Sequence, residues 1–240
     1  MSDSNENRIF QPSEKAEKKN LYIEALKKSL FVFILLGIMF FLPSWSLRYW
    51  EAWLYIGIFM IMMNIFLIYL LNKDPDLLKR RLKRKEKREP QKWIITVANV
   101  ILLLMYLFPS IDNRFNWSKV PTWTIFVADF ILIGSYGLFI WILRTNRYAS
   151  HTVEVEKGTQ KLITTGPYAI VRHPMYFSVA IMYGITPLAL GSWWGLLGII
   201  LFIPLLILRI LDEEKMLIEE LEGYEEYMKK TKYRVIPGIF

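Results

Sequence analysis

The chain has 240 residues, of which 54% are hydrophobic and 15% aromatic, and its formal net charge is +8. This composition is too apolar for an ordinary soluble domain, and the length allows several membrane crossings of about 20 residues each. Because the chain has no cysteine, disulfides, thiolate nucleophiles and thiolate metal sites are excluded. The only histidines are His151 and His173, so we expect no multi-histidine metal site.

Residues 1–20 are polar and mixed in charge, which predicts a solvated N-terminal tail. Six apolar segments follow it, over residues 29–43, 52–71, 93–109, 121–143, 175–190 and 193–211. They predict an all-α, polytopic transmembrane bundle with about six crossings. The chain then divides into the tail, N-terminal transmembrane helices over 21–143 and a C-terminal region over 144–240.

The fifth and sixth apolar segments are separated only by Gly191 and Ser192. So short a connection predicts a tight helical hairpin, and Trp193 and Trp194 beside it are typical of the membrane–water interface. After the last segment, apolar residues continue at helical spacing from Leu217 to Met228. This periodicity predicts an amphipathic C-terminal helix that extends beyond the bilayer.

The positive residues predict the orientation of the bundle. With six crossings, 26 of the 30 lysines and arginines fall on one side of the membrane and 3 on the other, while Arg209 lies inside the last segment. Positive residues favour the cytoplasmic side, so we expect both termini there. The basic run from Lys79 to Glu89 is interpreted as a topology signal that contacts anionic lipid headgroups. No nucleic-acid motif accompanies it, and we expect no nucleic-acid partner.

Polar side chains gather at the cytoplasmic ends of the last two segments. The stretch "TTGPYAIVRHPMYFS", from Thr164 to Ser178, precedes and enters the fifth segment. Taken singly, its arginine, histidine and tyrosines are typical of a membrane interface, and Pro174 suits a first helical turn. Arg209 differs, because an ionisable residue at membrane depth is costly and Glu213 lies one helical turn further on. Function is therefore favoured over a purely structural ion pair.

The motifs "GPYAIVRHPMY", "RILDEE", "LEGYEEY" and "RVIP" are arranged as in a known family. From about residue 145 to 240, the chain resembles the isoprenylcysteine carboxyl methyltransferase family and the related phospholipid methyltransferases. The resemblance implies an integral-membrane methyltransferase that uses S-adenosyl-L-methionine without a soluble Rossmann domain. No G-x-G-x-x-G fingerprint is present, in agreement with that expectation.

The resemblance also implies roles for residues. Arg209 and Glu213 are expected to be catalytic, with Arg209 and Arg172 facing the substrate and no metal involved. The cofactor-binding residues are expected to be Gln160, Lys161, Leu162, Ile163, Tyr168, His173, Pro174, Met175, Tyr176, Glu213 and Glu214.

Physical chemistry is consistent with these roles. A glutamate can meet the positive charge of the cofactor, and tyrosines offer apolar faces with a polar group. Arginine can hold a carboxylate through two parallel hydrogen bonds, and a carboxylate nucleophile needs alignment rather than a strong base. The leading hypothesis is thus carboxylate O-methylation of a lipophilic acceptor within the lipid bilayer.

Several alternatives remain open. Within methyltransferases, they are N-methylation of a phospholipid headgroup and S-methylation of a small thiol. An amine must lose a proton, and His151 and His173 are the only histidines that could take it. From other classes come an NADPH-dependent reductase of the sterol type and a non-enzymatic transporter. A transporter predicts polar groups near the bilayer midplane, whereas here they lie at the cytoplasmic ends.

Overall fold

The computed structural model describes residues 14–83, 89–146, 148 and 161–240, and within these ranges the chain is helical and contains no strand. The α-helices are α1 (Glu14–Ser44), α2 (Trp50–Lys73), α3 (Pro75–Lys83), α4 (Glu89–Phe115), α5 (Thr122–Thr145), α6 (Pro174–Ala189), α7 (Leu197–Glu220) and α8 (Tyr224–Lys230). Two short 3₁₀ turns, η1 (Gly166–Ala169) and η2 (Trp194–Leu196), precede α6 and α7. The predicted all-α class is confirmed.

Each of the six apolar segments forms one helix. Among the described residues, α1, α2, α4, α5 and α7 are long and apolar enough to cross a membrane. Helix α6 is also apolar but has 16 residues, so it extends about 24 Å, somewhat less than a hydrocarbon core of about 30 Å. Helix α1 begins at Glu14, within the segment expected to be a solvated tail, and residues 1–13 lie outside the described ranges.

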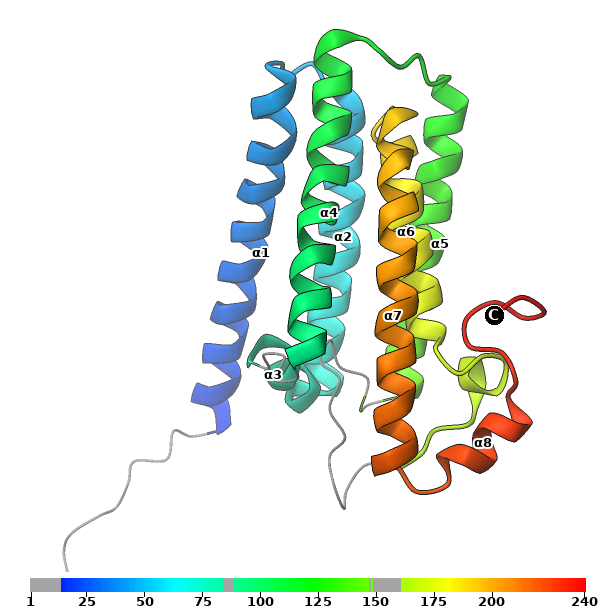
Figure 1. Ribbon diagram of the computed structural model, residues 1–240. Helices are drawn as coiled ribbons and strands as arrows, with labels where there is room; N and C mark the ends of the chain where they lie inside the picture. The colour runs from blue at the N-terminus through cyan, green and yellow to red at the C-terminus, as the bar shows by residue number, and fades with distance from the viewer. Residues whose placement is uncertain (1–13, 84–88, 147, 149–160) are drawn as a thin grey trace, which may run out of the picture.

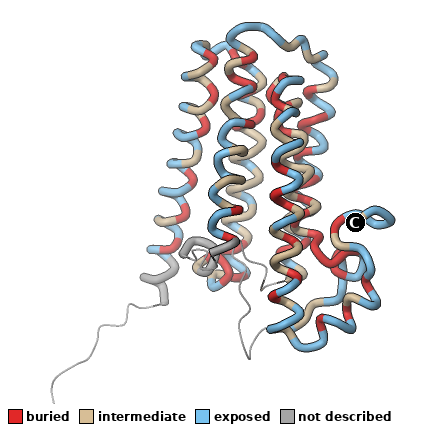
Figure 2. The backbone as a smooth tube through the Cα atoms, viewed as in Figure 1, coloured by how far each residue is buried: buried red, intermediate tan, exposed pale blue. Residues whose placement is uncertain are grey.

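The long helices run side by side as a bundle, with α1, α2 and α4 in one half and α5, α6 and α7 in the other (Figure 1). Exposed positions cover the outside of the bundle along its length (Figure 2), and many carry large apolar side chains, such as Phe31, Ile61, Phe130 and Ile200. In water these faces would be unfavourable, whereas lipid solvates them. The described chain is therefore an integral membrane protein.

One end of the bundle holds the connections between α1 and α2, α4 and α5, and α6 and α7. Asp112 at the end of α4 accepts hydrogen bonds from the Ser118 backbone N–H at 2.7 Å and from the hydroxyls of Ser118 and Ser192. Tyr49 donates its hydroxyl to the Leu190 carbonyl at 2.6 Å. These bonds hold the turn of the predicted α6–α7 hairpin against α2 and α4.

The opposite end of the bundle contains α3, α8 and the segment before α6, and the C-terminus lies beside the bundle (Figure 1). The amphipathic helix expected there is not continuous with the last membrane helix. Helix α7 ends at Glu220, and Gly223 adopts a left-handed φ of +80° before α8 begins at Tyr224. Glycine adopts this conformation without the steric cost of a side chain, so it lets the chain turn. The turn brings α8 and the residues after it back toward the start of α6.

Candidate active site

The segment before α6 is paired with the C-terminal segment through backbone hydrogen bonds. The Arg172 N–H donates to the Tyr233 carbonyl at 3.0 Å, and the His173 N–H donates to the Arg234 carbonyl at 2.7 Å. Pro174 then occupies the first turn of α6, where a missing N–H costs no intrahelical bond. Pro174 therefore favours the start of α6 at this position. The backbone hydrogen bonds to the C-terminal segment hold the two residues before it in place.

Glu214 of α7 is buried beneath three basic side chains. Its carboxylate accepts hydrogen bonds from Arg172 Nε at 2.7 Å and Arg234 Nε at 2.6 Å, and His173 Nε2 lies 3.3 Å from it. The Glu214 and Arg172 side chains are only 5% and 4% exposed. Arg172 also donates to the carbonyls of Thr231 and Lys232, each at 2.7 Å. This cluster ties α7, the start of α6 and the C-terminal segment together.

Tyr176, one turn into α6, connects the two residues expected to be catalytic. Its hydroxyl donates to the Glu213 carboxylate and accepts a hydrogen bond from Arg209 Nε at 3.0 Å. The Arg209 guanidinium carbon also lies 6.0 Å from the centre of the Tyr176 ring. The structure therefore brings Arg209 and Glu213 to one place, with a buried tyrosine hydroxyl between them.

Tyr168 lies in η1 and is 9% exposed. Its carbonyl accepts a hydrogen bond from the Tyr227 hydroxyl of α8 at 2.6 Å. Burial raises the pKa of Tyr227 to about 12, so this hydroxyl keeps its proton at neutral pH. Burial likewise raises the pKa of Tyr168. Helix α8 thus holds η1 in place through a donor that does not titrate in the physiological range.

The remaining expected cofactor residues lie on the approach to η1 and at the start of α6. Lys161 is exposed, and Leu162 and Ile163 are half-buried. Leu162 lies close to the Gly223 turn, since a Cβ on that glycine would be 3.7 Å from its side chain. Gln160 lies outside the described residues. Pro174 is buried and Met175 is half-buried at the first turn of α6.

A cavity of about 410 Å³ opens beside Arg209 and Tyr176 and extends into the bundle. Asn99 and Arg209 are the polar and charged side chains among mainly apolar and aromatic walls from α4, α5, α6 and α7. The walls comprise Ile94, Ile95, Ala98, Leu102, Phe139, Met175, Tyr176, Val179, Tyr183, Phe202, Leu205 and Leu206. One charged group at the end of an apolar chamber suits a molecule with a polar reacting end and a hydrophobic body.

Gln91 of α4 belongs to the surroundings of this site, although its position in the sequence gave no such indication. It is fully buried, and its amide nitrogen donates to Asp212 Oδ2 at 2.5 Å and to the Arg209 carbonyl at 3.4 Å. The contact holds α4 against the turn of α7 that carries Arg209. In the sequence, Gln91 is recognisable only as a polar residue just before an apolar segment. Many residues at a membrane interface occupy such a position, so the sequence could not indicate a role for Gln91 in the site.

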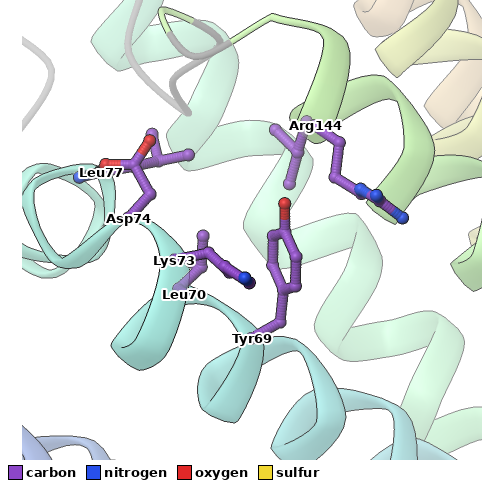
Figure 3. Close-up of a pocket in the computed structure, with 7 residues that line it drawn as sticks. Tyr69, Leu70, Lys73, Asp74, Leu77 and Arg144 are labelled. Carbon is purple, nitrogen blue, oxygen red and sulfur yellow. Dashed lines mark hydrogen bonds between the residues drawn. The ribbon is translucent and has the colours of Figure 1, made fainter.

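A second pocket at the same end contains none of the expected site residues (Figure 3). It measures about 210 Å³ and lies between α2, α3 and α5. Arg144 lies over the Tyr69 ring at 5.4 Å, and Asp74 caps the start of α3 by accepting from the Leu77 N–H at 3.1 Å. Lys73 lines this pocket as well, so its walls carry both negatively and positively charged side chains. Among the described residues, no group of acidic, histidine or cysteine side chains could hold a metal ion.

Fold and site together define an integral membrane protein with a polar site at the end of an apolar helical bundle. Residues 115–219 match the model of the isoprenylcysteine carboxyl methyltransferase (ICMT) family. The match covers α5, the segment before α6, α6 and nearly all of α7, so it includes Tyr176, Arg209 and Glu213. The resemblance expected from the motifs is confirmed for this region, and it supports a membrane methyltransferase. No curated protein matches the chain significantly.

Proposed function

We propose that the protein transfers a methyl group from S-adenosyl-L-methionine to the carboxylate of a lipophilic acceptor of the isoprenylcysteine type. The observation that carries the proposal is the meeting of Arg209, Tyr176 and Glu213, since Arg209 and Tyr176 also line the apolar cavity. S-adenosyl-L-methionine supplies an electrophilic methyl group on a sulfonium. In this proposal, Glu213 and the start of α6 bind the cofactor, while Arg209 and the apolar cavity bind the acceptor.

The residues at the start of α6 fit the charges of the cofactor. Glu213 is a half-buried carboxylate that can meet a positive group, and Tyr176 fixes its orientation through the donated hydroxyl. Tyr168 and Met175 offer apolar surface, and the backbone of 161–163 offers hydrogen-bonding groups. We propose that Lys161, Leu162, Ile163, Tyr168, His173, Pro174, Met175 and Tyr176 line this part of the site with Glu213, and that Gln160 extends it.

Arg209 is proposed to orient the acceptor. Its planar guanidinium can hold a carboxylate in a bidentate geometry, and its Nε is already fixed by Tyr176. The apolar walls of the cavity exclude water from the reacting atoms and receive the hydrophobic part of the acceptor. An in-line displacement by a carboxylate requires this alignment and no added base.

We propose a task for Arg172 and Glu214 that differs from the ligand contacts expected from the sequence. Both side chains are buried, and their charges are paired inside the protein. We propose that they position His173 and the start of α6 rather than contact acceptor or cofactor directly. Removing Glu214 leaves the buried Arg172 without its carboxylate partner, which is costly.

The same cluster favours a carboxylate acceptor over an amine. His173 Nε2 faces Glu214 at 3.3 Å, so its ring is engaged in the cluster rather than directed at the cavity. His151 lies outside the described residues. A carboxylate needs neither histidine as a base.

The test uses purified protein in lipid nanodiscs, labelled S-adenosyl-L-methionine, and N-acetyl-S-farnesyl-cysteine as acceptor. A methyl ester releases labelled methanol under mild alkali, whereas a methylated amine or thioether does not. We expect alkali-labile label that depends on the acceptor. Label that is stable to alkali in a phospholipid or thiol product would instead support the alternative acceptors.

A further inference from the structure

The pocket between α2, α3 and α5 lies where two membrane helices end (Figure 3). Lys73 is the last residue of α2, and Arg144 is the last but one of α5. Both helices run toward the end of the bundle that holds α8 (Figure 1). In Figure 3 the side chains of Lys73 and Tyr69 extend from α2 toward Arg144. The pocket is therefore placed at the level where lipid headgroups meet the hydrocarbon core.

Packing around the pocket holds its walls in place. Leu77 of α3 and Leu70 of α2 belong to one buried apolar cluster, and both line the pocket. Further into the membrane, Phe66 of α2 and Phe139 of α5 form an edge-to-face pair with ring centres 6.3 Å apart. The three helices are thus fixed to one another around a space of about 210 Å³.

The charges around the pocket are mainly positive. Lys73 and Arg144 are exposed, and within the ranges that the structure describes neither forms an ion pair. Arg144 lies over the Tyr69 ring at 5.4 Å, which fixes the guanidinium beside the pocket. The acid that lines the pocket, Asp74, is buried, and its carboxylate caps α3 through the Leu77 N–H. Two cations therefore face a space whose acid is engaged in the helix cap.

These groups suit a phosphate. A guanidinium holds two phosphate oxygens through its planar fork, and an ammonium adds a second positive charge. The Tyr69 hydroxyl offers one more donor. Basic pockets between membrane helices at the cytoplasmic side are typical sites for anionic lipid headgroups.

The surroundings favour a lipid over a free phosphate ion. Leu70, Leu77 and Leu143 form apolar walls beside the charged groups. About one helical turn further into the membrane, Ile65 of α2 and Trp141 of α5 are 51% exposed each, on surfaces that lipid solvates. Hydrocarbon chains attached to the phosphate would lie along these surfaces, whereas a free ion gains nothing from them.

We propose that this pocket binds the headgroup of an anionic phospholipid, with Lys73, Arg144 and the Tyr69 hydroxyl as ligands of its phosphate. The site is separate from the Arg209 cavity, and its occupation does not depend on methyl transfer. A zwitterionic lipid fits less well, because its second charge is positive and Asp74 is engaged in the cap of α3. Helices α2 and α3 lie outside residues 115–219, the region that matches the family model.

The test is native mass spectrometry of the detergent-purified protein, titrated with dioleoyl phosphatidylglycerol or dioleoyl phosphatidylcholine. We expect the first phosphatidylglycerol to bind about tenfold more tightly than the first phosphatidylcholine, an effect of the size that two basic residues near a membrane surface supply. Lys73→Gln combined with Arg144→Gln should remove this preference. The control, Lys229→Gln combined with Lys230→Gln, removes the same charge from exposed positions of α8 and should keep it. Equal preferences in the two double variants would overturn the proposal, since general attraction to positive charge would explain both.

Two further measurements do not depend on the folding of the glutamine variant. Wild-type protein that binds the two lipids with equal affinity contradicts the proposal outright. The Tm of the wild-type protein in detergent distinguishes a lipid from a free ion. We expect phosphatidylglycerol to raise it, and inorganic phosphate at the same concentration to leave it unchanged. An equal rise with inorganic phosphate would show a site for a soluble anion instead of a lipid.

Discussion

At the scale of single residues, two neighbouring glutamates of the candidate site have different surroundings. Glu213 is half-buried and contacts Tyr176 beside the cavity, whereas Glu214 is buried under Arg172, His173 and Arg234. Consecutive residues of a helix point about 100° apart, so one side chain can face the cavity while the other faces the C-terminal segment. The pair "EE" in the sequence could not show this difference in surroundings.

Arg209→Lys tests whether the guanidinium orients the acceptor. Lysine keeps the positive charge but lacks the planar fork. We expect unchanged affinity for S-adenosylhomocysteine and an unchanged Tm, with kcat lowered about 100-fold through misalignment. Arg114→Lys, at an exposed position near the far end of α4, is the matched control and should retain full turnover. Near-normal turnover of Arg209→Lys would show that Arg209 does not align the nucleophile.

Glu214→Gln tests the structural role of the buried cluster. The amide has nearly the same shape, but Arg172 and Arg234 lose the charge that balances them. We expect a loss of about 3 kcal/mol in stability, measured as a lower Tm in detergent. Glu219→Gln, at an exposed position of the same helix, should not change Tm. Equal Tm values for the two variants would contradict a stabilising role for the cluster.

At the scale of helices, close backbone contacts fix the α6–α7 hairpin. A Cβ on Gly195 would lie 2.7 Å from Pro187 Cβ and 3.1 Å from Pro109 Cγ, so α4, α6 and η2 approach one another where only glycine fits. The rings of proline cannot rotate away. This contact sets the tilt of α7, which carries Arg209 and Glu213 at its other end.

Gly195→Ala should therefore destabilise the hairpin by about 1–3 kcal/mol, the usual cost of overpacking. Gly134→Ala on α5 is the control, because nothing lies within 4 Å of its added methyl group. Thermal unfolding followed by intrinsic tryptophan fluorescence measures both variants. A Tm for Gly195→Ala as high as that of Gly134→Ala would show that the hairpin adjusts without cost.

The helices could be predicted from the sequence, but the contacts between distant segments could not. Apolar runs of about 20 residues have few structural options in a membrane, so the six helices could be located. Their polar ends could not, since α1 begins at Glu14, well before residue 29, and α7 ends at Glu220, beyond residue 211. By contrast, Arg234 meets Glu214 only after the Gly223 turn redirects the chain, and Gln91 meets Asp212 across 121 residues. No periodicity records such pairings, so the hydrogen bond between Arg172 and Glu214 could not be foreseen.

At the scale of the whole molecule, the start of α1, α3 and α8 lie at one end of the bundle (Figure 1). This is the side to which 26 of the 30 lysines and arginines were assigned. We therefore expect the site to face the cytoplasm.

Because the chain has no cysteine, single-cysteine labelling can test the orientation cleanly. Lys92 and Lys119 are exposed near opposite ends of α4. In intact cells, a membrane-impermeant thiol reagent should label Lys119→Cys and not Lys92→Cys. Both should react after the cells are lysed. Labelling of Lys92→Cys in intact cells, with Lys119→Cys protected, would invert the orientation.

We propose that the start of α6 and Glu213 form a site for S-adenosyl-L-methionine. Calorimetric titration of S-adenosylhomocysteine into the purified protein in nanodiscs tests it most directly, with Glu213→Ala and the exposed control Glu219→Ala alongside. We predict saturable binding with one site per chain, weakened at least tenfold by Glu213→Ala and unchanged by Glu219→Ala. Absence of binding to the wild-type protein, or equal affinity in all three proteins, would show that Glu213 and the start of α6 do not form this site.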